Sequence, residues 1–200
     1  MRLLCIVMTV FLAGSLCLGW ADSLEAIREN SGNITSVRAD FVQEKHLKIL
    51  VRPLISKGIF VFQAPGSLRW EYRTPIQSLL LLHDGKMHKF VQHEGKLVED
   101  RSMGMDAMRV VSQEISQWLS GNFTDNPTFQ AELKPGRKIV LTPRSKGLGK
   151  LISRIELQLS EQPGLMDSVT IFEGKDSYTR LIFTNAVLNT TISPAVFTEK

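Results

Sequence analysis

The side chains of this sequence that could bind a metal or transfer a proton are few and scattered. The four histidines are His46, His83, His88 and His93. A protein metal site needs three or four such ligands converging on one point. His83 and His88 share one face of a predicted hairpin but lie diagonally, and His93 falls on the opposite face. The sequence therefore predicts no metal site.

Motifs of catalytic or nucleotide-binding proteins are absent from the sequence. It contains no nucleophile elbow, P-loop, dinucleotide fingerprint or zinc-protease helix. The glycine-rich KGLGK at 146–150 lacks the P-loop spacing, and we expect a turn between strands there. Glu71, between Arg69 and Arg73 on the outer face of a predicted strand, favours a solvated charge cluster over an acid–base pair. An esterase would need a Ser–His–acid cluster, of which the sequence gives no sign. We therefore predict a protein that is not an enzyme and needs no cofactor.

The first 21 residues have the pattern of a secretory signal peptide. Arg2 gives a short positive start, the run 3–18 is apolar with little interruption, and small residues follow it. We expect cleavage before Asp22 and export to the periplasm.

The expected mature chain, 22–200, is interpreted as one domain whose composition excludes several classes of protein. Both cysteines, Cys5 and Cys17, precede it, so it can form no disulfide, thiolate metal site or cysteine nucleophile. Loss of Arg2 lowers the formal net charge from +4 to +3, and no run of Lys or Arg is present. Nucleic-acid binding is therefore not predicted.

Alternating side chains and regular turns predict a mainly β protein. In GSLRWEYRTP at 66–75, Leu68, Trp70 and Tyr72 point to one face and charged residues point to the other. Turn signals recur about every ten residues, as in an all-β sandwich or barrel. The predicted strands are 37–45, 57–63, 68–73, 78–83, 86–93, 138–142, 152–159, 168–172 and 179–187.

Asp84 and Gly85 predict a two-residue hairpin turn, which fixes how the flanking strands pair. We interpret the face with fewer charges as interior; it carries Ser78, Leu80, Leu82, Met87, Lys89 and Val91. The other face carries Leu79, Leu81, His83, Lys86, His88, Phe90 and Gln92.

Two segments predict helices, a short one at 23–30 and a strongly amphipathic one at 105–122. Gly121 supplies a stop signal for the second. Its apolar stripe must lie against the sheet or its opening; the stripe is formed by Met105, Met108, Val111, Ile115, Trp118 and Leu119.

These apolar faces enclose either an ordinary core or a cavity for an apolar ligand. Composition alone favours the ordinary core. About ten strands, however, form a curved sheet around a hollow that must be filled or covered, and one helix is available to close it.

Several segments resemble one known family. They are ADFVQEK at 39–45, GIFVFQAPGSLRWEYRTP at 58–75, LLLLHDGK at 79–86, IVLTPRSKGLGKLISRIEL at 139–157 and GLMDSVTIFEGKDSYTRLIFTNAVLNTTISPAVF at 164–197. Over nearly the whole expected mature chain, the sequence resembles the LolA-type periplasmic carriers of outer-membrane lipoproteins.

The resemblance implies an open, strongly curved antiparallel sheet of about 11 strands, an incomplete barrel with an α-helical lid across its mouth. Its hollow would receive acyl chains. The implied lipid-binding residues from the sheet are Leu68, Trp70, Tyr72, Leu80, Leu82, Met87 and Val91. Those from the lid are Met105, Met108, Val111, Ile115 and Trp118.

The sequence departs from the family at two positions. The carriers have an arginine directly before the proline at the start of the third strand, which holds the lid closed; here that residue is Ala64. Their neighbouring phenylalanine, which contacts the inner-membrane release complex, corresponds to Leu68. We therefore expect acylated cargo without assigning it to lipoproteins.

The resemblance also implies a cargo and partner proteins. It implies an acylated lipoprotein or other lipid cargo, an inner-membrane release complex and an outer-membrane acceptor, with the carrier acting as a monomer. A regulatory module of the same fold, which senses lipids or lipoproteins, is the alternative.

Overall fold

A computed structural model describes residues 23–31, 33–100, 114–115, 117–174 and 176–200. The expected signal peptide and its cleavage site lie outside these residues. Eleven strands form most of the described chain. They are β1 (Ser36–His46), β2 (Leu54–Gln63), β3 (Ser67–Thr74), β4 (Ser78–His83), β5 (Lys86–His93), β6 (Lys96–Glu99), β7 (Phe129–Lys134), β8 (Lys138–Pro143), β9 (Arg154–Leu159), β10 (Met166–Phe172) and β11 (Tyr178–Leu188).

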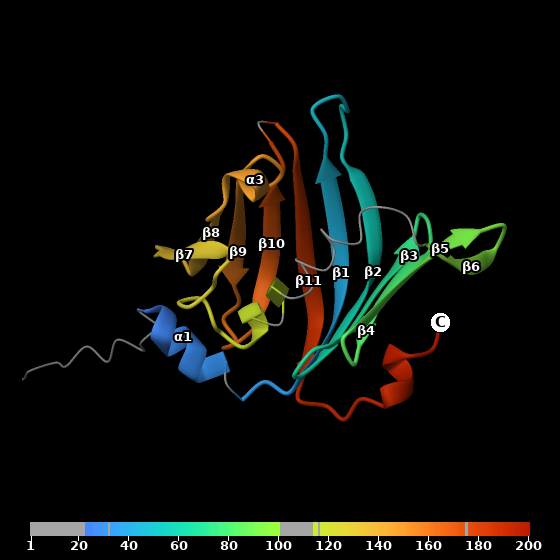
Figure 1. The fold of residues 1–200 in the computed structure, drawn as a ribbon, viewed down its shortest axis with the longest axis horizontal. Coiled ribbons are helices and arrows are strands. Elements are labelled where there is room, and N and C mark those ends of the chain that lie inside the picture. The colour runs from blue at the N-terminus through green and yellow to red at the C-terminus, as the bar shows by residue number, and fades with distance from the viewer. Residues whose placement is uncertain (1–22, 32, 101–113, 116, 175) are drawn as a thin grey trace, which may run out of the picture.

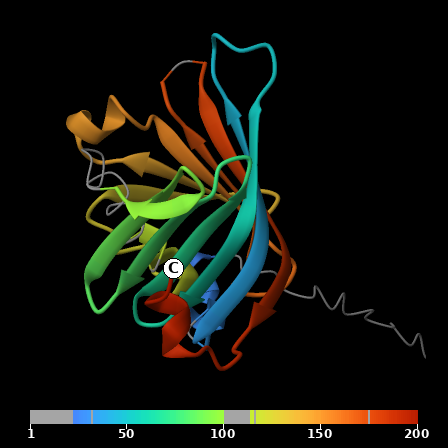
Figure 2. The ribbon, with the colours of Figure 1, turned by 90° about the vertical axis from the view of Figure 1, so that its right-hand side faces the viewer.

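All eleven strands belong to one antiparallel sheet in the order β6-β5-β4-β3-β2-β1-β11-β10-β9-β8-β7. Strands adjacent in sequence are adjacent in the sheet, except that β6 and β7 lie at its opposite edges. The pairing of β1 with β11 joins the two meanders, β1 to β6 and β7 to β11. The sheet is strongly curved, and its two edge strands, β6 and β7, each pair with a neighbour on one side and do not pair with one another (Figures 1 and 2). This confirms the predicted mainly β fold with an open, incomplete barrel.

The sequence predicted the β4–β5 hairpin most completely, because a two-residue turn fixes how its strands pair. Asp84 and Gly85 both have positive φ, at 48° and 70°, as a two-residue hairpin turn requires. The register is the predicted one, with Leu80 opposite Lys89 and Leu82 opposite Met87. Two strands, β6 and β7, were not predicted. The β6 strand is only four residues long and carries little signal. The alternation of β7, with Phe129, Ala131 and Leu133 apolar and polar residues between them, was present in the sequence and was missed.

Three short helices are defined: α1 (Leu24–Ser31), α3 (Lys146–Gly149) and the 3₁₀ helix η1 (Pro194–Phe197). The α3 helix stands where the sequence predicted a simple turn. The side chain of Ser145 accepts a hydrogen bond from the Leu148 backbone N–H and caps this single turn. No helix in the described part of the chain is long and apolar enough to cross a membrane.

The second predicted helix is described only near its end, where residues 114, 115 and 117–119 are helical. Gly121 then takes a φ of 68°, in agreement with the expected stop. Met105, Met108 and Val111 lie outside the described residues.

Both faces of the sheet bury apolar side chains. The concave face carries the main cluster, which includes Phe41, Phe60 and Trp70. The convex face carries two smaller clusters, one around Leu79 and Leu81 and one around Phe197 of η1. The leucines of β4 are therefore buried on both faces, which explains why the sequence shows leucine at consecutive positions.

The C-terminal segment covers part of the convex face and corrects one expectation. Arg69 Nη1 donates hydrogen bonds to the carbonyls of Val196 and Glu199, at 3.0 and 2.7 Å. Its Nε also donates to Glu71, at 2.8 Å. The Arg69 and Glu71 side chains are only 16% and 12% exposed. This pair therefore faces outward, as predicted, but it is buried and anchors the chain end rather than forming a solvated cluster.

Candidate functional site

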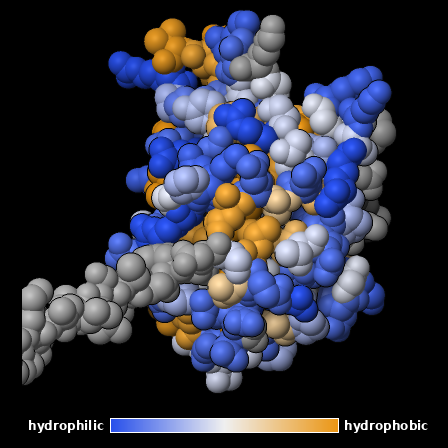
Figure 3. Space-filling view, turned by 90° about the vertical axis from the view of Figure 1, so that its left-hand side faces the viewer, coloured by the Kyte–Doolittle hydropathy of each residue, from blue (hydrophilic) through white to orange (hydrophobic). Residues whose placement is uncertain are grey.

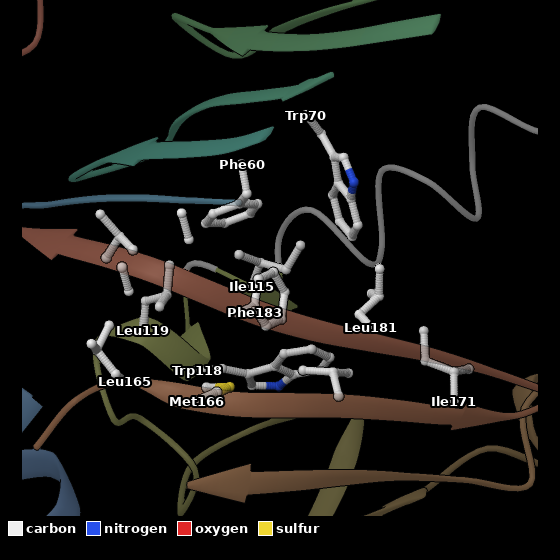
Figure 4. Close-up of a pocket in the computed structure, with 14 residues that line it drawn as sticks. Phe60, Trp70, Ile115, Trp118, Leu119, Leu165, Met166, Ile171, Leu181 and Phe183 are labelled. Atoms are coloured by element: carbon white, nitrogen blue, oxygen red, sulfur yellow. The ribbon is translucent and has the colours of Figure 1, made fainter. Parts of the chain in front are cut away.

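An apolar cavity lies on the concave side of the sheet, and the volume inside it that the centre of a water molecule can reach is about 50 Å³ (Figure 4). Its described lining residues are all apolar, and none carries a charge. They are Val37, Ala39, Phe60, Trp70, Ile115, Trp118, Leu119, Leu165, Met166, Val169, Ile171, Leu181, Phe183 and Ala186.

Period-two alternation explains most of the lining from the strands. Val37 and Ala39 of β1, Val169 and Ile171 of β10, and Leu181 and Phe183 of β11 are each two residues apart, so they share the concave face.

Strict period-two alternation would turn the apolar side chains of Met166 in β10 and Ala186 in β11 away from the cavity. A bulge in each pairing shifts the alternation by one residue and turns these side chains inward. In β11, Asn185 has a φ of 53° beside an irregularity in the pairing with β1, and Ala186 turns inward. In β10, the irregularity between Met166 and Ser168 places Met166 in the cavity wall and leaves Asp167 exposed. The bulges thus keep the wall apolar at these strand ends.

Aromatic rings form the wall contributed by β1, β2 and β3. The Trp70 ring lies edge-on to Phe41 and Phe60, with centroids 5.9 and 5.8 Å apart. Phe60 in turn contacts Phe183 edge-on at 5.8 Å. Edge-to-face pairs of this kind stabilise one another beyond their buried area, so this wall is fixed in shape.

Tyr72 extends the same wall toward a polar partner. Its hydroxyl donates to Gln43 Oε1 at 2.7 Å. Burial raises the pKa of the Tyr72 phenol well above its usual value. The phenol is therefore neutral and acts as a fixed hydrogen-bond donor, not as an acid or base.

The segment containing Ile115, Trp118 and Leu119 closes the opposite side of the cavity. Glu114, the first described residue of this segment, is tied through Asn126 to the strand that follows, β7. The Asn126 Nδ2 donates to Glu114 Oε2 at 2.5 Å, and its Oδ1 accepts from the Thr128 and Phe129 backbone N–H groups. The C-terminal end of the predicted lid is thus anchored to β7.

Three of the twelve sequence-predicted site residues, Trp70, Ile115 and Trp118, line this cavity. Leu68 and Leu80 are buried in the same concave-face cluster, and Tyr72, Leu82 and Met87 pack against it without lining the cavity. Val91 belongs to none of the described clusters. Met105, Met108 and Val111 fall outside the described residues, and Ala64 is exposed in the β2–β3 connection.

Sequence reasoning missed the part of the lining that comes from β1, β2, β10 and β11. The signal was present in the alternation of Val37 with Ala39 and of Leu181 with Phe183. What it lacked was the β1–β11 pairing, which brings together residues such as Val37 and Leu188 from opposite ends of the chain.

A second, wider hollow, of about 740 Å³ by the same measure, adjoins the first and shares Trp118, Leu165 and Met166 with it. It lies between α1 and the β7–β8 and β9–β10 turns, and its rim includes Lys134 and Arg137. Figure 3 shows hydrophobic surface in a hollow with polar surroundings on the side of the molecule that carries α1 and β7.

The described lining of the cavity suits apolar groups, and no ionisable side chain belongs to it. Among the described residues, no group of three His, Cys, Asp or Glu side chains could hold a metal ion. The polar atoms of the two lining tryptophans, Trp70 Nε1 and Trp118 Nε1, are buried and make no hydrogen bond within the described structure.

Comparison with protein families gives one match. The model described as "Outer membrane lipoprotein carrier protein LolA" matches residues 32–200. Comparison with curated proteins gives no match.

Solved structures with low sequence identity are similar to this chain. A DUF1329 family protein from Desulfovibrio piger is 13% identical with a TM-score of 0.48, over 87% of this chain and 94% of that one. The LolA superfamily protein NE2245 from Nitrosomonas europaea is 10% identical with a TM-score of 0.45, over 90% and 99%. MucB, in a complex of Pseudomonas aeruginosa MucA and MucB, is 19% identical with a TM-score of 0.40, over 86% and 57%. Since each TM-score is below 0.5, the family assignment depends on the family model.

Proposed function

The chain belongs to the outer membrane lipoprotein carrier protein LolA family, and we propose that it is a periplasmic carrier which binds acyl chains in its concave-face cavity. It would move an acylated lipoprotein or another lipid between the inner and outer membranes and would act without catalysis. An inner-membrane release complex and an outer-membrane acceptor would be its partners.

The apolar cavity lining is the observation that supports this proposal. Each methylene transferred from water into such a lining contributes about 0.8 kcal/mol, so one long acyl chain contributes on the order of 10 kcal/mol. Affinity of this size needs no charged contact, which agrees with the lack of charged side chains among the described lining residues.

The buried indole N–H groups of Trp70 and Trp118 favour an acyl ester or amide over a plain hydrocarbon. A buried donor without a partner is costly, and a ligand carbonyl that accepts from it removes that cost. We propose that at least one of these groups donates to the carbonyl that joins the acyl chain to the rest of the cargo.

The expected signal peptide supports the periplasmic location. We propose 1–21 as that peptide and 22–200 as a single carrier domain.

A matched pair of substitutions tests the cavity. Ala186 lines it, whereas the next residue, Val187, is exposed on the other face of β11. We expect Ala186→Phe to occupy the cavity and to weaken binding of a dansyl-labelled fatty acid at least about tenfold, because the ring takes the place of the chain. Val187→Phe should bind the probe like the parent. Equal binding by Ala186→Phe and the parent would exclude this cavity as the acyl site.

The regulatory alternative requires a different experiment. A carrier should release its bound acyl chain to acceptor vesicles, whereas a sensor should retain it and bind a protein partner only when loaded. Native mass spectrometry of the protein purified from its own periplasm, before and after incubation with such vesicles, identifies the cargo and measures its release.

A further inference from the structure

The hairpin that joins β1 to β2 exposes an unusual group of aliphatic side chains. Ile49 and Val51, at its end, are 86% and 102% exposed. We define the apolar tip as these residues with their exposed neighbours Leu50, Leu54 and Ile55. Contiguous exposed apolar side chains are uncommon in proteins that remain free in water, and they mark contact with another apolar phase.

The apolar tip projects away from the rest of the molecule. The β1–β2 pairing runs up to Lys45 and Leu54, and a turn closed by the Leu50 N–H and the Leu47 carbonyl follows. In Figures 1 and 2 this hairpin extends beyond the neighbouring strands. Figure 3 shows hydrophobic side chains gathered at the same upper end of the molecule.

Cationic side chains surround the apolar tip. Lys48 directly precedes it in sequence, Arg52 lies between Val51 and Leu54, and both cations are exposed. Lys48 pairs with Asp176 at 2.8 Å, and the structure records no ion pair for Arg52. The α3 helix lies at the same end of the sheet (Figure 1), and exposed Lys146 and Lys150 accompany it.

The α3 connection adds one more exposed aliphatic side chain to this end. Leu151, directly after the helix, is 66% exposed. This end of the molecule therefore combines projecting aliphatic groups with exposed cationic side chains.

We propose that this end docks on an anionic lipid bilayer, with the apolar tip inserted among the acyl chains and the flanking cations at the headgroups. Insertion into the bilayer removes the aliphatic groups from water, and anionic headgroups attract the nearby Lys and Arg side chains. The proposal goes beyond acyl binding, because no residue of the apolar tip lines the cavity.

The shape of the tip favours a bilayer over a protein partner. A stable protein interface buries about 800 Å² on each side and is centred on aromatic or arginine anchors in pockets. The end of one hairpin is convex and offers a few aliphatic side chains without an aromatic residue. Such a shape suits insertion into a fluid phase that deforms around it.

Vesicle flotation of the full exported protein tests the proposal. The vesicles contain three parts phosphatidylethanolamine to one part phosphatidylglycerol, with pure phosphatidylcholine vesicles for comparison. We expect binding to the anionic vesicles, weaker binding to the neutral ones, and a decrease as salt is added. No binding to the anionic vesicles, or equal binding to both kinds, would overturn the proposal.

Two double variants separate the tip from general surface hydrophobicity. Ile49→Ser with Val51→Ser should lower anionic-vesicle binding at least about tenfold, since membrane affinity scales with buried apolar area. Ile76→Ser with Val98→Ser, which removes aliphatic groups that are 62% and 53% exposed elsewhere on the surface, should leave it within about twofold. Equal effects of the two double variants on vesicle binding would contradict a specific role of the tip. The role would also be contradicted if the Ile49→Ser, Val51→Ser variant lost self-association in sedimentation but still bound vesicles like the parent.

A tryptophan placed in the tip provides a direct readout of insertion. Val51→Trp should show blue-shifted emission with anionic vesicles, and Val98→Trp should not. Dansyl fatty-acid binding is measured on the same variants and should not change. If the parent protein does not bind the dansyl fatty acid, the proposed carrier function is rejected. If it binds the fatty acid but not the anionic vesicles, only the proposed docking on the bilayer is rejected.

Discussion

Arg69 and Glu199 are 130 residues apart in sequence, yet the Arg69 guanidinium donates to the Glu199 carbonyl at 2.7 Å. The same side chain bonds the Val196 carbonyl and Glu71. Phe197 between these carbonyls is buried with Ile59 and Val61 and stacks on His83 at 5.9 Å. The convex face of the sheet is therefore completed by residues 196–199, and Arg69 fixes them there.

Replacement of Arg69 should release this C-terminal segment. Hydrogen bonds to a charged group contribute about 1.5–3 kcal/mol, so we expect Arg69→Ala to lower the free energy of unfolding by about 2–3 kcal/mol in urea titrations. Arg73 also bonds Glu71 but is 54% exposed, and Arg73→Ala should cost less than about 1 kcal/mol. Equal losses for the two variants would show that the C-terminal contacts add nothing.

Acidification should lower the free energy of unfolding, because it protonates Glu71, which is hydrogen-bonded to Arg69. Burial alone would raise the pKa of Glu71, but the hydrogen bonds from Arg69 and Arg73 outweigh it and hold this pKa below its ordinary value of 4.5. A lowered folded-state pKa adds stability that is complete above the ordinary value and is lost as pH falls through the folded-state value. We therefore expect Glu71→Gln to lose less stability than the parent on acidification below about pH 4.5. The control is Glu161→Gln, at an exposed position, and acid unfolding curves that coincide for parent and Glu71→Gln would refute the assignment.

Gly58 should tolerate no side chain. A Cβ there would lie 1.9 Å from the Glu71 carbonyl oxygen and 2.9 Å from the Phe41 ring. Gly58 also sits at the irregularity in the β2–β3 pairing, so the backbone cannot move aside without breaking the ladder. We expect Gly58→Ala to destabilise the fold by about 3 kcal/mol or more. Gly66→Ala, where nothing lies within 4 Å, should have little effect, and thermal unfolding compares the two.

A charge at Trp70 should abolish acyl binding. The indole lines the cavity and contacts Phe41 and Phe60, so Trp70→Glu places a carboxylate in an apolar wall. We expect at least about a tenfold loss of dansyl fatty-acid affinity, whereas Arg73→Glu on the exposed face should bind normally. Circular dichroism shows whether each variant is folded. Because Arg69 anchors the C-terminus, it is unsuitable as the control, although it also points away from the cavity.

Local sequence determined the strands and hairpins with strong patterns. The β4 and β5 bounds and their register follow from the Asp84–Gly85 turn and from alternation, because both act between near neighbours. The orientation of Trp70 toward the concave face follows from alternation in the same way. The β6 strand and the single-turn α3 were beyond this reasoning, since a four-residue element carries too little signal. The alternating β7 was within its reach and was missed.

The tertiary structure alone decided which residues enclose the cavity. Its wall depends on the pairing of β1 with β11, which joins opposite ends of the chain, and on bulges that turn Met166 and Ala186 inward against strict alternation. It also decided that Arg69 is buried, because the covering segment lies more than a hundred residues away in sequence. Side-chain periodicity specifies only that a strand has an apolar face. What that face meets is set by contacts between distant segments, which form because the whole sheet must bury both of its faces.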